Sequence, residues 1–149
     1  MEPKIIAAGV LPICWRTGRA LLSKRHPHVE YGDTWASWGG KFEDGIDSDP
    51  IACAKREFWE ETRIDAPHHP LQEPVHVYED DRVTYYTFIA FFDHEPEADI
   101  VTEGGIAAAQ WFPLDSFPEP LMPEFQEMMD AEMEKIKKML KEIQEENGE

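Results

Sequence analysis

Cysteine and basic side chains are scarce in this sequence. Only 2 of the 149 residues are cysteines, which is too few for a disulfide framework. Because Cys14 and Cys53 are flanked by apolar or small residues, we expect both to be buried free thiols. Lysine and arginine together number 14 against 31 acidic residues, so the formal net charge is −17. A field of that sign repels the phosphate backbone, and long DNA or RNA is therefore not an expected partner.

Long apolar runs are also absent. No stretch approaches the length of a membrane span, and residues 1–4 lead directly into an amphipathic segment instead of a signal peptide. Neither an internal repeat nor a low-complexity linker is visible, and the six histidines match no structural zinc spacing. We therefore expect a cytoplasmic protein with no membrane partner.

What is present suffices for one packed domain spanning residues 1–149. The length is near the mode for single domains, and 42% of the residues are hydrophobic, including 5 tryptophans and 8 phenylalanines. Periodicity predicts strands at 4–15 and 19–25 that form one hairpin, and strands at 74–78 and 83–92 that form another. The other predicted elements are a short strand within 35–42, a helix at 50–62, a long loop at 93–108, a brief strand at 110–112 and an amphipathic helix at 123–145.

The predicted helix at 50–62 carries a group of acidic side chains. Glu57, Glu60 and Glu61 stand at positions i, i+3 and i+4, which puts three carboxylates on one face within about one turn. Like charges at this spacing repel one another, so a compensating cation is expected. All-oxygen ligands favour a hard ion, Mg²⁺ or Mn²⁺. The alternative interpretation is a solvated acidic helix face.

The surrounding residues resemble a known motif. Gly39-Gly40 precedes the helix, Asp49 is a suitable N-cap, and Pro50 fits the first helical position. The segment is similar to the Nudix box, which reads Gly, five residues, Glu, seven residues, Arg-Glu-apolar-any-Glu-Glu-any-Gly-apolar. The residues that match the pattern in order are Gly40, Arg56, Glu57, Phe58, Glu60, Glu61 and Ile64. The resemblance implies an α+β fold, an α/β/α sandwich with a mixed sheet and the box helix packed on it.

Two departures from the box concern its loop and the end of its helix. The loop is two residues longer than the pattern, and Asp47 and Asp49 are the candidates to replace its first Glu. The late Gly of the pattern, which adopts a left-handed conformation, is Arg63 here. A side chain in that conformation costs about 1 kcal/mol unless the helix ends differently.

The resemblance also implies an activity. Members of the family are metal-dependent pyrophosphohydrolases that cleave a nucleoside diphosphate linked to another moiety, by attack of water at phosphorus. The substrate stays open among a nucleotide sugar such as ADP-ribose, a modified nucleoside triphosphate and a dinucleoside polyphosphate. The alternative is a catalytically impaired nucleotide-binding or regulatory domain on the same fold.

By the same resemblance, the box residues hold the metal. Glu57, Glu60, Glu61 and the carbonyl of Gly39 are the expected ligands of Mg²⁺ or Mn²⁺. Glu103, in the loop before Trp111, is a further expected ligand or the general base; an ordinary acidic surface loop is the alternative. Arg56 belongs to the same catalytic group, where we expect it to tie the box loop to the helix by ion pairing; an ordinary structural salt bridge is the alternative.

Candidates for substrate contact are fewer. Arg25 resembles the position at which family members contact a phosphate, with a solvated strand end as the alternative, and Lys41 is a second candidate. Trp35 and Tyr85 offer aromatic faces to a base, although aromatic residues on strands are more often part of the core. Further aromatic candidates are Trp38, Tyr86 and Phe88. The end of the last helix, from about residue 137, can pair with a second copy, so a homodimer is possible; a frayed terminal helix is the alternative.

Overall fold

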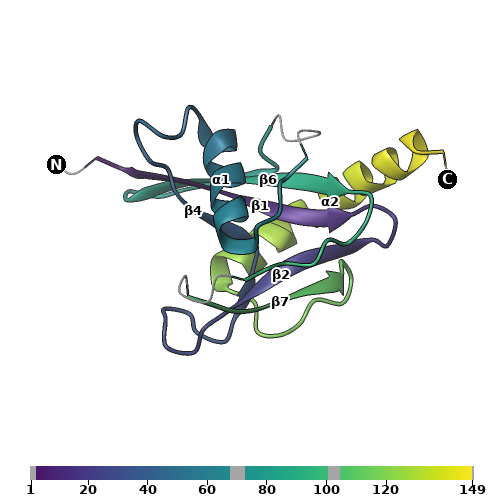
Figure 1. The fold of residues 1–149 in the computed structure, drawn as a ribbon, viewed down its shortest axis with the longest axis horizontal. Helices are drawn as coiled ribbons and strands as arrows, with labels where there is room; N and C mark the ends of the chain where they lie inside the picture. Colours follow the sequence, from purple (N-terminus) through teal and green to yellow (C-terminus); the bar gives the residue numbers. More distant parts are fainter. Residues whose placement is uncertain (1–2, 68–72, 101–104, 149) are drawn as a thin grey trace.

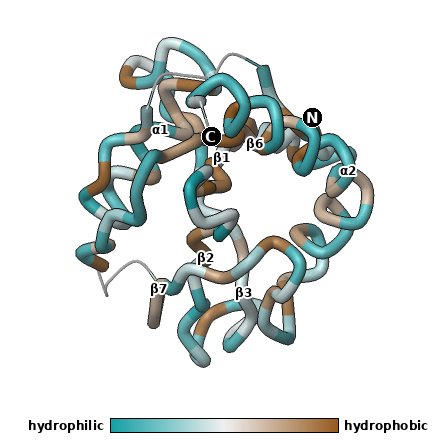
Figure 2. Tube along the Cα trace, turned by 90° about the vertical axis from the view of Figure 1, so that its right-hand side faces the viewer, coloured by the Kyte–Doolittle hydropathy of each residue, from teal (hydrophilic) through white to brown (hydrophobic). Residues whose placement is uncertain are grey.

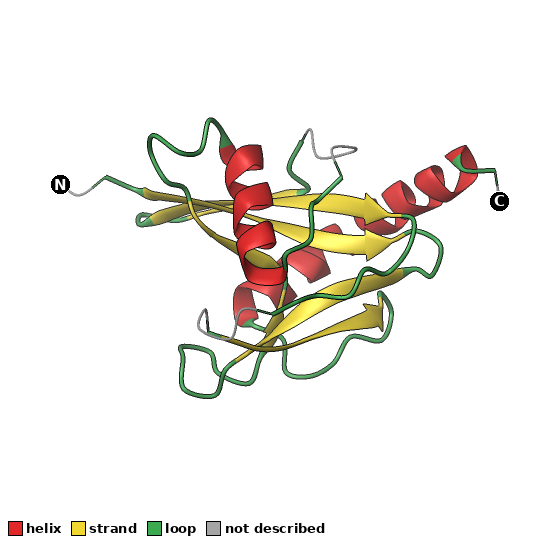
Figure 3. Cartoon of the chain, viewed as in Figure 1, coloured by secondary structure: helices red, strands yellow, loops and turns green. Residues whose placement is uncertain are grey.

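A mixed sheet with a helix on each face forms the molecule (Figures 1 and 3). In this computed structural model the described residues, 3–67, 73–100 and 105–148, contain a seven-stranded sheet and two helices. The elements are β1 (Ile5–Cys14), β2 (Arg19–Arg25), β3 (Trp35–Ala36), β4 (Trp38–Lys41), α1 (Pro50–Thr62), β5 (His76–Glu79), β6 (Val83–Phe92), β7 (Ile106–Pro113) and α2 (Pro123–Glu146). The predicted α+β sandwich is confirmed.

Strand β1 is the centre of the sheet. It runs parallel to β6 over its whole length, from Ile5 opposite Val83 to Cys14 opposite Phe92. On its other side, β1 pairs with β4 from Ala7 to Val10 and with β2 at its last two residues, Ile13 and Cys14. Strand β5 lies antiparallel to β6, and β7 and β3 both pair with β2. Both predicted hairpins, β1 with β2 and β5 with β6, are therefore present.

One predicted strand was too short. The sequence indicated a brief strand at 110–112 after a long loop, whereas β7 begins at Ile106. It pairs with β2 from Arg19 to Arg25, so tertiary pairing extends the strand through three alanines with low intrinsic strand preference.

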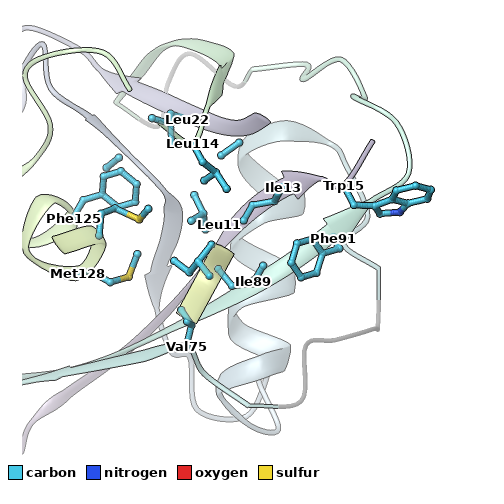
Figure 4. Packing of buried hydrophobic residues seen from close by; sticks show 14 residues of the cluster. Leu11, Ile13, Trp15, Leu22, Val75, Ile89, Phe91, Leu114, Phe125 and Met128 are labelled. Carbon is cyan, nitrogen blue, oxygen red and sulfur yellow. The ribbon is translucent and has the colours of Figure 1, made fainter. Parts of the chain in front are cut away.

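The core is divided by the sheet. Alternate residues of β1 and β6 point to opposite faces, so Val10 and Phe88 pack beneath α1, while Leu11 and Ile89 pack beneath α2. Figure 4 shows the second cluster, in which Phe125 and Met128 of α2 lie over the strand residues. In Figure 2 hydrophobic positions gather along β1, β2 and β6. Both cysteines are buried free thiols, as predicted.

Helix α1 has the predicted bounds because its ends are chemically defined. The Asp49 side chain accepts a hydrogen bond of 2.8 Å from the Ala52 N–H, and Pro50 opens the helix. At the other end Arg63 is left-handed, with φ 62° and ψ 23°, and its N–H donates to the Trp59 carbonyl. Arg63 thus adopts the left-handed conformation that glycine usually takes at the end of a helix. Its guanidinium lies 4.5 Å from the centre of the Trp59 ring.

Helix α2 packs on the sheet well beyond its midpoint. Ile136 is fully buried, and the partly buried residues Leu140 and Ile143 extend the same cluster. Gln144 donates a side-chain hydrogen bond of 2.8 Å to the Trp15 carbonyl. Neither of the two helices in the described residues is long and apolar enough to cross a membrane.

Candidate active site

Strand β4 and helix α1 bring the box glycines and glutamates together. At Gly40 the Glu57 carboxylate occupies the space that a side chain would fill, so a larger residue there would displace that carboxylate. A side chain at Gly39 would meet the hydroxyl of Tyr85 and the backbone of β1. The backbone of Gly39 and Gly40 therefore lies directly beside the Glu57 carboxylate and the Tyr85 hydroxyl.

Glu61 is the most unusual group of this site. Its Oε1 atom is buried without a hydrogen-bond partner, alone in this respect among side-chain atoms of the described residues. Burial, followed by the negative charge of Glu57, raises the pKa of Glu61 to about 8, although a backbone hydrogen bond from Gly39 acts in the opposite direction. Burial also raises the pKa of Glu57, against the attraction of Arg56.

Arg56 connects the box loop to α1. Its Nε and Nη2 donate to the two carboxylate oxygens of Asp47 at 2.8 and 2.9 Å, and Nη2 also donates to the Lys41 carbonyl at 3.0 Å. Its Nη1 lies 3.3 Å from Glu57 and 3.1 Å from Glu60. The side chain of Asp47 is only 2% exposed, and the hydrogen bond from Arg56 lowers its pKa.

The two aspartates that are candidates to replace the first Glu of the box have different contacts. Asp47 accepts hydrogen bonds from the Arg56 guanidinium and from the Glu43 N–H, so it connects the loop to the helix. Asp49 is engaged as the helix cap. Of the two candidates to replace the first Glu of the box, Asp47 is thus the one paired with Arg56.

The residues present fit a divalent cation. Within the part of the chain that the structure describes, no three His, Cys, Asp or Glu side chains form a complete metal centre, and Glu103 lies outside the described residues. Glu57 and Glu61 nevertheless supply two adjacent carboxylates with raised pKa values and one unpaired oxygen. A hard cation would relieve both the repulsion and the missing contact. Glu60 is more exposed, at 49%, and is paired with Arg56.

A cleft of about 350 Å³ adjoins Glu61 on the α2 face of the sheet, and this size suits a small molecule. Strand register defines its floor, because Gly39 pairs with Gly9, Gly9 with Thr87, and Thr87 with His76 across β4, β1, β6 and β5. The hydroxyl of Tyr85 lies over the two glycines. The lining comprises Ser23, Arg25, Glu30, Tyr31, Ala36, Ser37, Gly39, Glu61, His76, Tyr78, Val83, Tyr85, Thr87, Ile106, Met122, Glu124, Phe125 and Met128.

The cleft contains two of the four substrate-contact candidates. Arg25 lines it, with its Nε donating to the Glu30 carbonyl at 2.7 Å, and so does Tyr85. Trp35 lies outside the lining and packs edge-on against Phe112, with 5.0 Å between ring centres. Lys41 is exposed and also lies outside the lining.

The other aromatic candidates belong to the core. Trp38 is buried and donates from Nε1 to the Leu21 carbonyl at 3.0 Å. Tyr86 and Phe88 pack on the α1 side of the sheet, away from the cleft. Sequence reasoning missed His76, Tyr78 and Glu124, because they reach the cleft only through the pairing of β5 with β6 and the position of α2.

Comparison with protein-family models gives a match to the NUDIX domain over residues 3–132. The chain belongs to the NUDIX family. It is a Nudix-type hydrolase, the class of enzymes that act on phosphoric anhydride bonds. A search of curated proteins gave no match.

Solved structures of Nudix proteins share the fold. The MutT NUDIX hydrolase from Burkholderia pseudomallei is 24% identical, with 87% of this chain and 98% of that chain covered and a TM-score of 0.68. The NUDIX domain of Shewanella oneidensis NrtR, complexed with ADP ribose, is 15% identical over 91% and 90% of the two chains, with a TM-score of 0.72. A bifunctional NMN adenylyltransferase/ADP ribose pyrophosphatase from Francisella tularensis, complexed with AMP and a Mn ion, is 19% identical over 91% of this chain and 42% of that chain, with a TM-score of 0.68.

Proposed function

We propose that this Nudix protein is a metal-dependent pyrophosphohydrolase that cleaves a nucleoside diphosphate linked to another moiety. The observation that carries the proposal is the unpaired, buried Oε1 of Glu61, beside Glu57 and at the head of a cleft of small-molecule size. A buried carboxylate without a partner is costly, and a site for a cation accounts for that cost. The ADP ribose and AMP bound by two structural neighbours support a nucleotide ligand.

Glu57, Glu61 and the main chain at Gly39 would hold the ion, Mg²⁺ or Mn²⁺, with Glu60 and Glu103 as further ligands. When bound, such an ion offsets the charge of a diphosphate and makes water a better nucleophile. Glu103 is proposed as the general base if it is not a ligand.

The remaining side chains orient the substrate. Arg25 places a cation in the cleft that also contains Glu61, where it can fix a phosphate group. Tyr85 lines the cleft with its hydroxyl over Gly9 and Gly39, and its ring would provide an apolar surface for the rest of the ligand. Arg56, paired with Asp47, holds the box loop and the helix in register so that the carboxylates keep their places.

Release of phosphate tests the proposal. The purified protein, with a coupled phosphatase, is offered ADP-ribose and other nucleotide sugars, dinucleoside polyphosphates, and canonical or oxidised nucleoside triphosphates, each with Mg²⁺, Mn²⁺ or EDTA. We expect cleavage of one class that EDTA abolishes. Folded protein that binds nucleotide and cleaves none of them would instead identify a binding or regulatory domain, and cleavage that persists in EDTA would refute the metal requirement.

A further inference from the structure

The cleft has a second polar end, away from the box glutamates. His76 of β5 lines the cleft, and its Nδ1 lies 2.7 Å from Oε2 of Glu132 on α2. Both side chains are largely buried, at 24% and 23% exposed. Across the sheet His76 is three strands from Gly39, which corresponds to about 14 Å.

Glu132 occupies an unusual place on its helix. It is four residues from both Met128 and Ile136, so it shares the face that α2 turns toward the sheet, and both of those neighbours are buried. A carboxylate on an otherwise apolar stripe is costly unless it is paired. The hydrogen bond to His76 supplies the partner and fixes the imidazole at the same time.

The pairing determines what the imidazole can offer to a ligand. An ionised carboxylate only accepts hydrogen bonds, so it requires the proton to be on Nδ1 of His76. When the imidazole is neutral, the remaining nitrogen, Nε2, is therefore a hydrogen-bond acceptor.

The charges of the cleft indicate which part of a ligand lies there. Of the lining residues in the described chain, Arg25 is the one permanent cation, and it is hydrogen-bonded to the Glu30 carbonyl. The other acidic lining residues are Glu61 and Glu124, and the His76 end also holds the Glu132 carboxylate. A second phosphate group is therefore poorly suited to the His76 end. An uncharged ring with N–H donors, lying on Tyr85, matches both the aromatic floor and the acceptor.

From these contacts we propose that His76, held by Glu132, is the specificity-determining residue of the cleft and accepts a hydrogen bond from the exocyclic amine of a nucleobase. The inference rests on the proposed function, because it concerns the nucleoside part of the same ligand. Such a hydrogen bond would favour adenosine and cytidine derivatives over inosine and uridine derivatives, in which a carbonyl oxygen would face Nε2 of His76.

Binding of matched nucleotides tests the role of His76. Calorimetric titrations in alkaline buffer with Mg²⁺ measure the affinity for two pairs of nucleotides, ADP with IDP and CDP with UDP. The members of each pair differ in one exocyclic group of the base, an amine in the first and a carbonyl in the second. We expect the wild-type protein to bind the amine member of at least one pair about tenfold more tightly, the difference that one satisfied hydrogen bond makes. In His76→Phe that ratio falls to about one, while binding of pyrophosphate, which does not reach this end, is unchanged.

Two further variants separate this role from a structural one. His76→Gln keeps a polar group of similar reach, but an amide can donate or accept, so the amine-to-carbonyl ratio falls even if the fold is intact. Glu132→Gln can donate to Nδ1 and thereby turn Nε2 into a donor, so the preference shrinks or reverses. His94→Phe is the matched control, since His94 is also paired with a neighbouring carboxylate but is 71% exposed and outside the cleft.

The outcomes distinguish this inference from the proposed function. The protein could hydrolyse one of the nucleotides named above and yet show the same ADP-to-IDP and CDP-to-UDP affinity ratios in wild type and His76→Phe. That result would overturn the inference alone. If the wild-type protein hydrolyses none of the nucleotides but its binding preference for the amine base is lost in His76→Phe, the inference is supported and the hydrolase is refuted. A wild-type protein that binds neither pair, or binds both members equally, would also overturn the inference.

Discussion

At the scale of single residues, Glu61 has the largest shift toward the protonated form among the acidic groups of the site. Its pKa rises from 4.5 in a free side chain to about 8 in the fold. Between those values the folded chain keeps a proton that the unfolded chain loses, so stability falls as pH rises from about 4.5 to 8. The metal-free protein therefore carries a destabilising group at neutral and alkaline pH.

Glu61→Gln removes that cost. We expect the metal-free variant to be more stable than wild type by about 2 to 4 kcal/mol near pH 9, with the difference vanishing near pH 4.5. Urea unfolding at several pH values measures it. Added Mn²⁺ should stabilise wild type and leave the variant nearly unchanged, because binding to the folded state alone raises stability. Equal stability of the two proteins at every pH would contradict this account of Glu61.

The pH dependence of activity follows from the same group. A carboxyl group must lose its proton to bind a metal, so we expect metal affinity and turnover to rise with pH from about 6 to 9. Measurement of Mn²⁺ affinity across this range, together with turnover, checks the prediction. A metal affinity that is constant over the range would show that Glu61 is not a ligand.

Asp47 and Asp49 make a matched pair of mutations. Asp47→Ala leaves Arg56 without its main partner in a largely buried position, and we expect a loss of about 2 to 3 kcal/mol in the free energy of unfolding. Asp49→Ala removes only a helix cap, which is worth about 1 kcal/mol. Since the pKa of Asp47 is lowered in the fold, its contribution is present above its ordinary pKa and disappears as pH falls through the lowered value. Equal losses in the two variants at neutral pH would refute the distinction.

At the scale of the elements, the end of α1 gives a simple test of backbone strain. Arg63 takes a left-handed conformation that glycine adopts freely, and its stacking on Trp59 offsets only part of the cost. We therefore expect Arg63→Gly to raise the free energy of unfolding by about 0.5 to 1 kcal/mol. Thermal melts of Arg63→Gly and Arg63→Ala separate the two contributions, because alanine loses the stacking and keeps the strain. A lower melting temperature for the glycine variant would contradict the expectation.

The elements also show how far sequence reasoning reached. The bounds of α1 could be predicted because Asp49 and Pro50 mark its start by local chemistry. The length of β7 could not, because only pairing with β2 extends the strand as far as Ile106. The lining of the cleft could not be predicted for the same reason. Gly39, Thr87 and His76 lie in line across the sheet only because of the register between its strands.

At the scale of the whole molecule, α2 is part of the fold and not only a possible dimer contact. The helix extends past the ends of β1 and β6 (Figure 1), yet Ile136 is fully buried and Ile143 still packs on the cluster. The predicted homodimer stays a prediction. Sedimentation of the full-length protein over a range of concentrations tests it, with a concentration-independent monomer as the contradictory result.

Removal of the last part of α2 has a separate expected effect. A chain ending at Lys135 loses Ile136 and the residues beyond it, and deletion of large buried side chains costs about 2 to 5 kcal/mol each. We expect a clearly lower melting temperature, measured by circular dichroism. An unchanged melting temperature would show that this part of the helix contributes nothing to the core. A change in oligomeric state can be assigned to the helix only if the shortened chain is shown to be folded.

The central claim is that Glu61 holds a catalytic metal in a Nudix hydrolase, and turnover by Glu61→Gln tests it most directly. With Mg²⁺, the rate of phosphate release from the nucleotide that wild type cleaves fastest should fall at least about 100-fold in this variant, equivalent to about 2.7 kcal/mol in the activation barrier. Glu60→Gln, at the more exposed position paired with Arg56, serves as the comparison and should lose less. Because Glu61→Gln is expected to be more stable than wild type without metal, a folded variant is expected in the assay, and circular dichroism with Mg²⁺ checks it. Near-normal turnover by a correctly folded Glu61→Gln variant would contradict the account.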